Sequence, residues 1–186
     1  MMISALDFFL RAELQRSSDH PKGWDWYVLD SERLHQDILQ FLIPRSVAFT
    51  RSLLEVDWDR VSCVREPRRG SFDLLAVSGE AQRYIEIKVF QAWTQADKQC
   101  ELLSASGAQA AYIVLGKSAA DLTEAAIRTR TNGHGYKVSY HRLYRAIDSM
   151  SEGGDPATVR EFGKAYRAAL VEHETRARQR WPTLES

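Results

Sequence analysis

The chain has 186 residues, of which 44% are hydrophobic and 27% charged. This composition excludes a disordered or collagen-like chain, and the length favours one compact domain with an added helical tail. The 25 lysine and arginine residues equal the 25 aspartate and glutamate residues, so net charge provides no general attraction to nucleic acid or anionic lipid. A site for a polyanion must therefore be a local patch.

The cysteines and the amino-terminal segment bear on the expected location. Cys63 and Cys100 are too few for a disulfide framework and have no metal-binding spacing. The apolar start of the chain is interrupted by Asp7 and lacks a small-residue cleavage site. No run reaches the roughly 18 apolar residues of a membrane span. We therefore expect reduced thiols, a cytoplasmic location and no membrane segment.

The first half of the chain is predicted to hold two helices and then extended segments. The first helix spans residues 4–15, and the second begins near Asp30 or Ser31 and ends before Pro44. Gly79 lies where the last two extended segments would turn. The extended segments are expected at 47–56, 60–64, 72–77 and 83–90.

Helices and strands alternate in the second half. Thr94 and Asp97 form a capping-box pattern, which predicts a helix that closes at Gly107. Ser118 and Asp121 form another such pattern, which predicts a helix to about residue 132. The other expected elements are a buried strand at 110–115, a short strand at 136–140, a helix at 141–150 and a last amphipathic helix after the breaker at 153–156.

This order of elements predicts an α/β protein with a mixed sheet flanked by helices. Residues 1–150 are expected to form one domain, and residues 151–186 a C-terminal helical extension packed on it or projecting from it. No internal repeat or low-complexity tract divides the chain further.

Three charged residues lie in the last two extended segments. Asp73 interrupts an apolar strand, where an ionised carboxylate is costly unless it is paired or binds a cation. On the next strand side chains alternate, so Glu86 and Lys88 share one face while the apolar residues between them pack on the other. If the strands pair through Gly79, Asp73 and Glu86 approach each other and repel unless a divalent cation lies between them. This arrangement predicts an oxygen site for Mg²⁺ or Mn²⁺.

The frame SFDLLAV, followed by RYIEIKV, resembles the signature of the PD-(D/E)xK nuclease superfamily over about residues 31–140. The resemblance implies a restriction-endonuclease-like core, αβββαβ, to which this chain adds a C-terminal helix. It also implies that Asp73 and Glu86 are metal ligands and that Lys88 orients or activates the attacking water. The proline that often precedes the family's aspartate is replaced here by Phe72.

Two further residues fit the resemblance. In many members the helix before the strands supplies a glutamate, and Glu32 stands at the inner edge of that helix as a further metal ligand. Gln99, on the helix after the strand that carries Glu86 and Lys88, loosely resembles a glutamine found there in some members. Other interpretations stay open: Glu32 could merely complement the helix dipole, Gln99 could be an ordinary polar residue, and Glu86 with Lys88 could be a surface ion pair.

An arginine cluster precedes Asp73. Arg65, Arg68 and Arg69 could hold phosphates of a nucleic acid, or they could lie in a solvated turn. The expected partner is DNA. At this size a homodimer or a partner protein for targeting is also expected.

These features predict a metal-dependent endonuclease that hydrolyses DNA phosphodiester bonds, in defence or in DNA repair. One alternative is a catalytically silent subunit with the nuclease fold that binds nucleic acid or scaffolds a complex. Another is an unrelated α/β protein in which Asp73 and Lys88 simply form a salt bridge.

Overall fold

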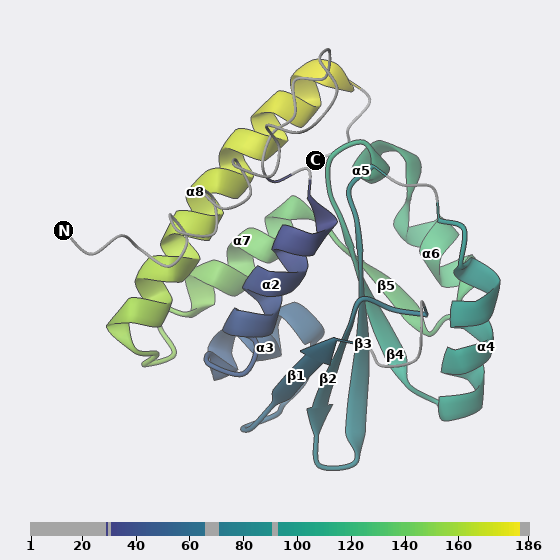
Figure 1. Cartoon of the computed structure of the whole chain (residues 1–186), viewed down its shortest axis with the longest axis horizontal. Coiled ribbons are helices and arrows are strands. Elements are labelled where there is room, and N and C mark those ends of the chain that lie inside the picture. The colour runs from purple at the N-terminus through teal and green to yellow at the C-terminus, as the bar shows by residue number, and fades with distance from the viewer. Residues whose placement is uncertain (1–28, 30, 66–70, 91–92, 183–186) are drawn as a thin grey trace.

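The computed structural model describes residues 29, 31–65, 71–90 and 93–182. The helix expected at 4–15 lies outside these residues, as do Arg68 and Arg69. In chain order the elements are α2 (Glu32–Leu42), α3 (Val47–Leu54), β1 (Ser62–Arg65), β2 (Leu74–Ser78), β3 (Ala81–Lys88), α4 (Ala96–Ser106), β4 (Gln109–Val114), α5 (Ser118–Asp121), α6 (Glu124–Arg130), β5 (Gly135–Val138), α7 (Tyr140–Ser149) and α8 (Ala157–Arg180) (Figure 1).

The strands form one mixed sheet in the order β1-β2-β3-β4-β5. β1, β2 and β3 are antiparallel neighbours, whereas β4 and β5 continue the sheet in parallel with β3. Helices α2, α3, α7 and α8 lie on one side of the sheet, and α4, α5 and α6 on the other (Figure 1). Both sides being covered explains why β4 is almost wholly buried and apolar. The predicted α/β fold with a flanked mixed sheet and a C-terminal helix is confirmed.

The extended segment predicted at 47–56 is wrong, because this stretch is the helix α3. Its β-branched residues favoured a strand, but the buried side chains of Phe49, Leu53 and Leu54 recur at helical spacing. Ser46 begins the helix by accepting a hydrogen bond from the backbone nitrogen of Phe49 at 3.1 Å. The Ser46 hydroxyl also donates to the buried carboxylate of Asp155 at 2.5 Å. The local N-cap and the helical spacing of the apolar residues therefore outweigh β-propensity here, and the contact with Asp155 adds to them.

Two predicted helix starts also differ from the structure. Helix α4 begins after Gln95, which provides no side-chain cap, so the capping box expected from Thr94 does not form. The helix expected from Ser118 to about residue 132 is divided into α5 and α6. Thr123, in extended conformation, caps α6 by accepting from the Ala126 nitrogen at 3.1 Å. A second N-cap inside the segment thus starts a new helix.

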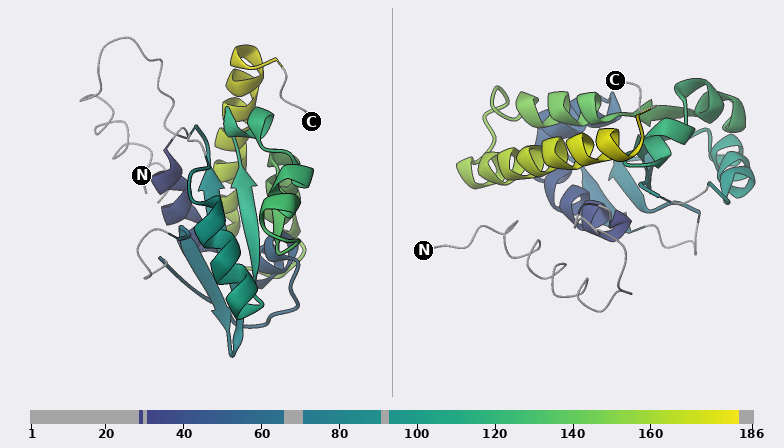
Figure 2. Two further views of the ribbon diagram at one scale, coloured as in Figure 1. Left: turned by 90° about the vertical axis from the view of Figure 1, so that its right-hand side faces the viewer. Right: turned by 90° about the horizontal axis from the view of Figure 1, so that it is seen from above.

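Helix α8 packs along α7 and reaches α2 (Figure 2). The rings of Phe162 and Phe41 lie 4.6 Å apart, and the Tyr166 hydroxyl lies 2.7 Å from Nδ1 of the buried His35. These contacts hold α2 against the fold, which matters because α2 carries Glu32 at its first position. Within the described part of the chain, no helix has the length and apolar character needed to cross a membrane.

Candidate active site

β3 extends beyond β2 at one end of the sheet. The pairing of the two strands ends at Leu74 and Ile85, whereas β3 continues to Lys88. The last backbone bond of this ladder runs from the nitrogen of Asp73 to the carbonyl of Ile85 at 3.1 Å. β4 remains paired with β3 on the other edge as far as Lys88. The β2-facing edge of β3 is therefore without a strand partner from residue 86 onward in the described structure.

Two carboxylates take the backbone nitrogens that β2 leaves unpaired. Oδ2 of Asp73 accepts from the nitrogen of Ile87 at 2.7 Å, and Oε1 of Glu32 accepts from the nitrogen of Val89 at 2.9 Å. Buried peptide N–H groups require a partner, so this geometry explains why acidic residues stand at an otherwise apolar place. Asp73 and Glu32 are thus brought to the same strand from different elements.

A glutamine on α2 completes the surroundings of Asp73. Nε2 of Gln36 donates to Oδ1 of Asp73 at 2.8 Å. Gln36 lies four residues after Glu32, so both point toward β3 from one face of the helix. The sequence interpretation missed Gln36, although its spacing from Glu32 was a usable signal.

Glu86 and Lys88 form a buried ion pair on one face of β3. Their Oε1 and Nζ atoms are 2.6 Å apart, with 4% of the glutamate side chain and 12% of the lysine side chain exposed. Burial, reinforced by the Asp73 carboxylate, raises the pKa of Glu86 to about 7. Burial alone would lower the pKa of Lys88, but the carboxylates of Glu86, Glu32 and Asp73 outweigh it and raise that pKa. Lys88 is therefore an ammonium ion at neutral pH.

The pKa values of the other two carboxylates, Asp73 and Glu32, are also raised. Burial raises the pKa of Asp73, against the hydrogen bond from Ile87 and the charge of Lys88. Burial likewise raises the pKa of Glu32, and the charge of Asp73 adds to this effect. Three carboxylates thus share the positive charge of Lys88 in a poorly hydrated place, which favours the approach of a further cation.

Gln99 on α4 joins the site from the other side of the sheet. Its side chain is fully buried. Nε2 donates to the carbonyl of Ser71 at 2.5 Å. The same side chain also donates to the carboxylate of Glu86, which opposes part of the rise in its pKa. The structure therefore brings together all five side chains that the sequence assigned to catalysis, Asp73, Glu86, Lys88, Glu32 and Gln99.

Arg65 ends β1 next to this group. It pairs with Leu74, the residue after Asp73, and its charge offsets a small part of the rise in the pKa of Asp73 that burial causes. Nη2 of Arg65 lies 2.5 Å from Oδ1 of Asp37 on α2, with 43% of the arginine side chain exposed. Arg65 is thus at the edge of the carboxylate group and open to solvent.

A metal site is not preformed in the described ranges, where no three histidine, cysteine, aspartate or glutamate side chains are gathered for one ion. The donor chemistry nevertheless suits a hard cation. The carboxylates of Asp73, Glu86 and Glu32 supply oxygen ligands, and Mg²⁺ is commonly held by only one or two carboxylates with water and substrate phosphate. The side chains present therefore fit Mg²⁺ or Mn²⁺.

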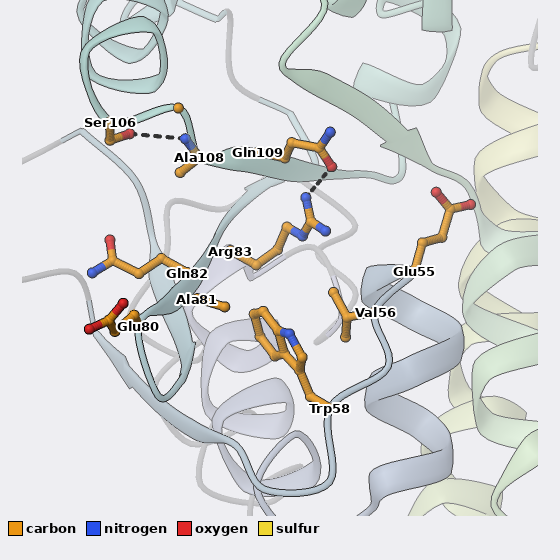
Figure 3. A pocket seen from close by; sticks show the side chains of 11 residues that line it. Glu55, Val56, Trp58, Glu80, Ala81, Gln82, Arg83, Ser106, Ala108 and Gln109 are labelled. Atoms are coloured by element: carbon orange, nitrogen blue, oxygen red, sulfur yellow. Dashed lines mark hydrogen bonds between the residues drawn. The ribbon is translucent and has the colours of Figure 1, made fainter.

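A separate groove of about 590 Å³ lies at the opposite end of β3. Its lining includes Trp58 and Arg83, which lie opposite each other in the hollow (Figure 3). The guanidinium of Arg83 donates there to the side chain of Gln109. The groove involves the first residues of β3 and none of the carboxylate group.

Comparison of the chain with protein-family models, curated proteins and solved structures finds no significant match.

Proposed function

We propose that this chain is a metal-dependent endonuclease of the PD-(D/E)xK type that hydrolyses DNA phosphodiester bonds. The observation that carries the proposal is the convergence of three carboxylates on one buried ammonium at the free edge of β3. The order of α2, the antiparallel strands β1 to β3, α4 and the parallel strand β4 supports a restriction-endonuclease-like core. Helix α3 is an addition between α2 and β1.

Asp73 and Glu86 would hold Mg²⁺ or Mn²⁺, with Glu32 as a further ligand. A bound divalent ion would lower the pKa of a bound water and neutralise charge on the scissile phosphate. The raised pKa values of the three carboxylates support this role, since a cation offsets the cost of ionising them together in a buried place.

Lys88 would orient the attacking water and donate to the charge that develops on the phosphate. Because its pKa is raised, it is charged at neutral pH and cannot act as a base in that state. One of its three N–H groups faces Glu86, which leaves donors for water or substrate. No covalent enzyme intermediate is needed.

DNA would be held next to these groups by Arg65, whose guanidinium is partly exposed. Arg68 and Arg69 would extend the same phosphate contact. The alternative salt bridge between Asp73 and Lys88 has less support, because the close ion pair of Lys88 is with Glu86. Defence or DNA repair is the proposed setting, with the chain acting in the cytoplasm as a homodimer or with a partner protein.

The test is cleavage of plasmid, linear, single-stranded and branched DNA by the full chain with Mn²⁺, Mg²⁺ or EDTA. Lys88→Ala should slow single-turnover cleavage by about 10²- to 10⁴-fold, the usual contribution of a positioned proton-handling group, with DNA affinity retained. Lys98→Ala, at an exposed lysine of α4, is the matched control. Binding of DNA without cleavage of any substrate would instead support the silent subunit.

A further inference from the structure

The amide of Gln99 has only one orientation that satisfies its surroundings. Oε1 accepts from Nε1 of Trp93 at 2.7 Å and from the hydroxyl of Tyr112 at 3.0 Å. Both partners are donors at this position, since an indole nitrogen can only donate. The amide nitrogen must then face acceptors, and it does so at the Ser71 carbonyl and the Glu86 carboxylate.

The fold places these donors beside Glu86. Tyr112 on β4 is the register partner of Glu86 on β3, so both side chains point to the same face of the sheet. Trp93 comes just before α4, and its ring lies 4.9 Å from that of Tyr112. Tyr112 and Gln99 are fully buried and Trp93 almost so. Bulk water therefore does not replace a lost partner at the amide.

We propose that Tyr112 and Trp93 are positioning residues for Glu86, which act by holding the N–H side of the Gln99 amide toward its carboxylate. Glu86 is then fixed between Lys88 and Gln99. Without the two donors, the buried amide oxygen has no partner, so the side chain can leave the position in which its N–H group faces Glu86. The inference rests on the proposed function for the metal that Glu86 would bind.

The chain offers a matched control for the Tyr112 hydroxyl. Tyr136 on β5, the strand next to β4, is also buried. Its hydroxyl has no hydrogen-bond partner among the residues described here. Tyr136→Phe removes a hydroxyl of the same kind without touching Gln99, whereas Tyr112→Phe removes one of the two donors.

The experiment is calorimetric titration of the full chain with Mn²⁺. We expect Tyr112→Phe and Trp93→Phe each to weaken binding about fivefold to tenfold, the effect of one lost hydrogen bond. The double variant should bind more weakly than either, and Tyr136→Phe should bind like wild type. Melting temperatures in EDTA separate folding from metal affinity. Equal Mn²⁺ affinity in wild type and the double variant would overturn the inference.

A second readout keeps this inference distinct from the proposed function. If wild type binds no Mn²⁺, the proposed metal centre fails, but the orientation of Gln99 can still be examined by NMR in the metal-free chain. The side-chain amide protons of Gln99 should exchange slowly with solvent in wild type and in Tyr136→Phe, and faster in the double variant. Unchanged exchange in the double variant would show that Tyr112 and Trp93 do not hold the amide.

Discussion

Glu86 should make the metal-free protein less stable as the pH rises. Burial and the Asp73 carboxylate raise its pKa from 4.5 to about 7 in the folded chain. Between these values the folded chain binds more protons at this position than the unfolded chain, so the free energy of unfolding falls with increasing pH. The full difference corresponds to about 3 kcal/mol, since a tenfold change in proton affinity is worth about 1.4 kcal/mol.

Glu86→Gln removes this titration, because glutamine is neutral at every pH. The stability contribution of a protonated Glu86 is complete below pH 4.5 and is lost as the pH passes 7. We therefore expect the variant and wild type to be similar near pH 5. At pH 8 the variant should be more stable by about 1–3 kcal/mol, although its ion pair with Lys88 is gone.

The measurement is urea unfolding followed by circular dichroism at pH 5, 6, 7 and 8 in EDTA. Glu101→Gln, at an exposed glutamate of α4, is the control and should show no change with pH relative to wild type. A Glu86→Gln variant that is less stable than wild type by the same amount at every pH would refute the reasoning. The ion pair with Lys88 would then outweigh the cost of burying the carboxylate.

Three further predictions concern metal, DNA and folding. Mn²⁺ at about 100 times its dissociation constant should stabilise wild type by about 2.7 kcal/mol and leave Asp73→Ala unchanged, which thermal melting checks. Asp37→Asn frees Arg65 from its ion pair and should tighten DNA binding about twofold to fivefold, whereas Arg65→Ala should weaken it and reduce the salt slope by about one in fluorescence anisotropy. Ser46→Ala removes the cap of α3 and the donor to Asp155, and should cost about 1–3 kcal/mol in chemical unfolding.

Local periodicity was enough to predict the face that Glu86 and Lys88 share, because strand alternation depends only on sequence position. The hairpin that joins β2 to β3 in antiparallel pairing was indicated by a different local signal, the turn residue Gly79 between two extended segments. Helix α3 was missed because its β-branched residues were given more weight than the local N-cap at Ser46 and the helical spacing of Phe49, Leu53 and Leu54, and because the contact of Ser46 with Asp155 joins distant parts of the chain. Secondary-structure propensity depends only on neighbouring residues, so it does not predict a contact between residues so far apart in the chain.

The hydrogen-bond partners around the acidic residues could not be predicted from the sequence, because they come from other elements. Gln36 reaches Asp73 only because α2 packs against the sheet beside the start of β2. Tyr112 meets Gln99 only because β4 pairs with β3 in a particular register. Both contacts depend on how different elements pack together. Residue spacing along a single element does not give this information.

The free edge of β3 has a consequence for solubility. An exposed strand edge is a template on which another chain can add a strand, and aggregation begins in this way. Here the two open backbone nitrogens, at Ile87 and Val89, are occupied by the charged side chains of Asp73 and Glu32. These carboxylates therefore also block the addition of another strand at this edge. A variant with alanine at both positions would leave these nitrogens without their acceptors, so a catalytic knockout at these two positions carries a risk of aggregation that a single change at Lys88 avoids.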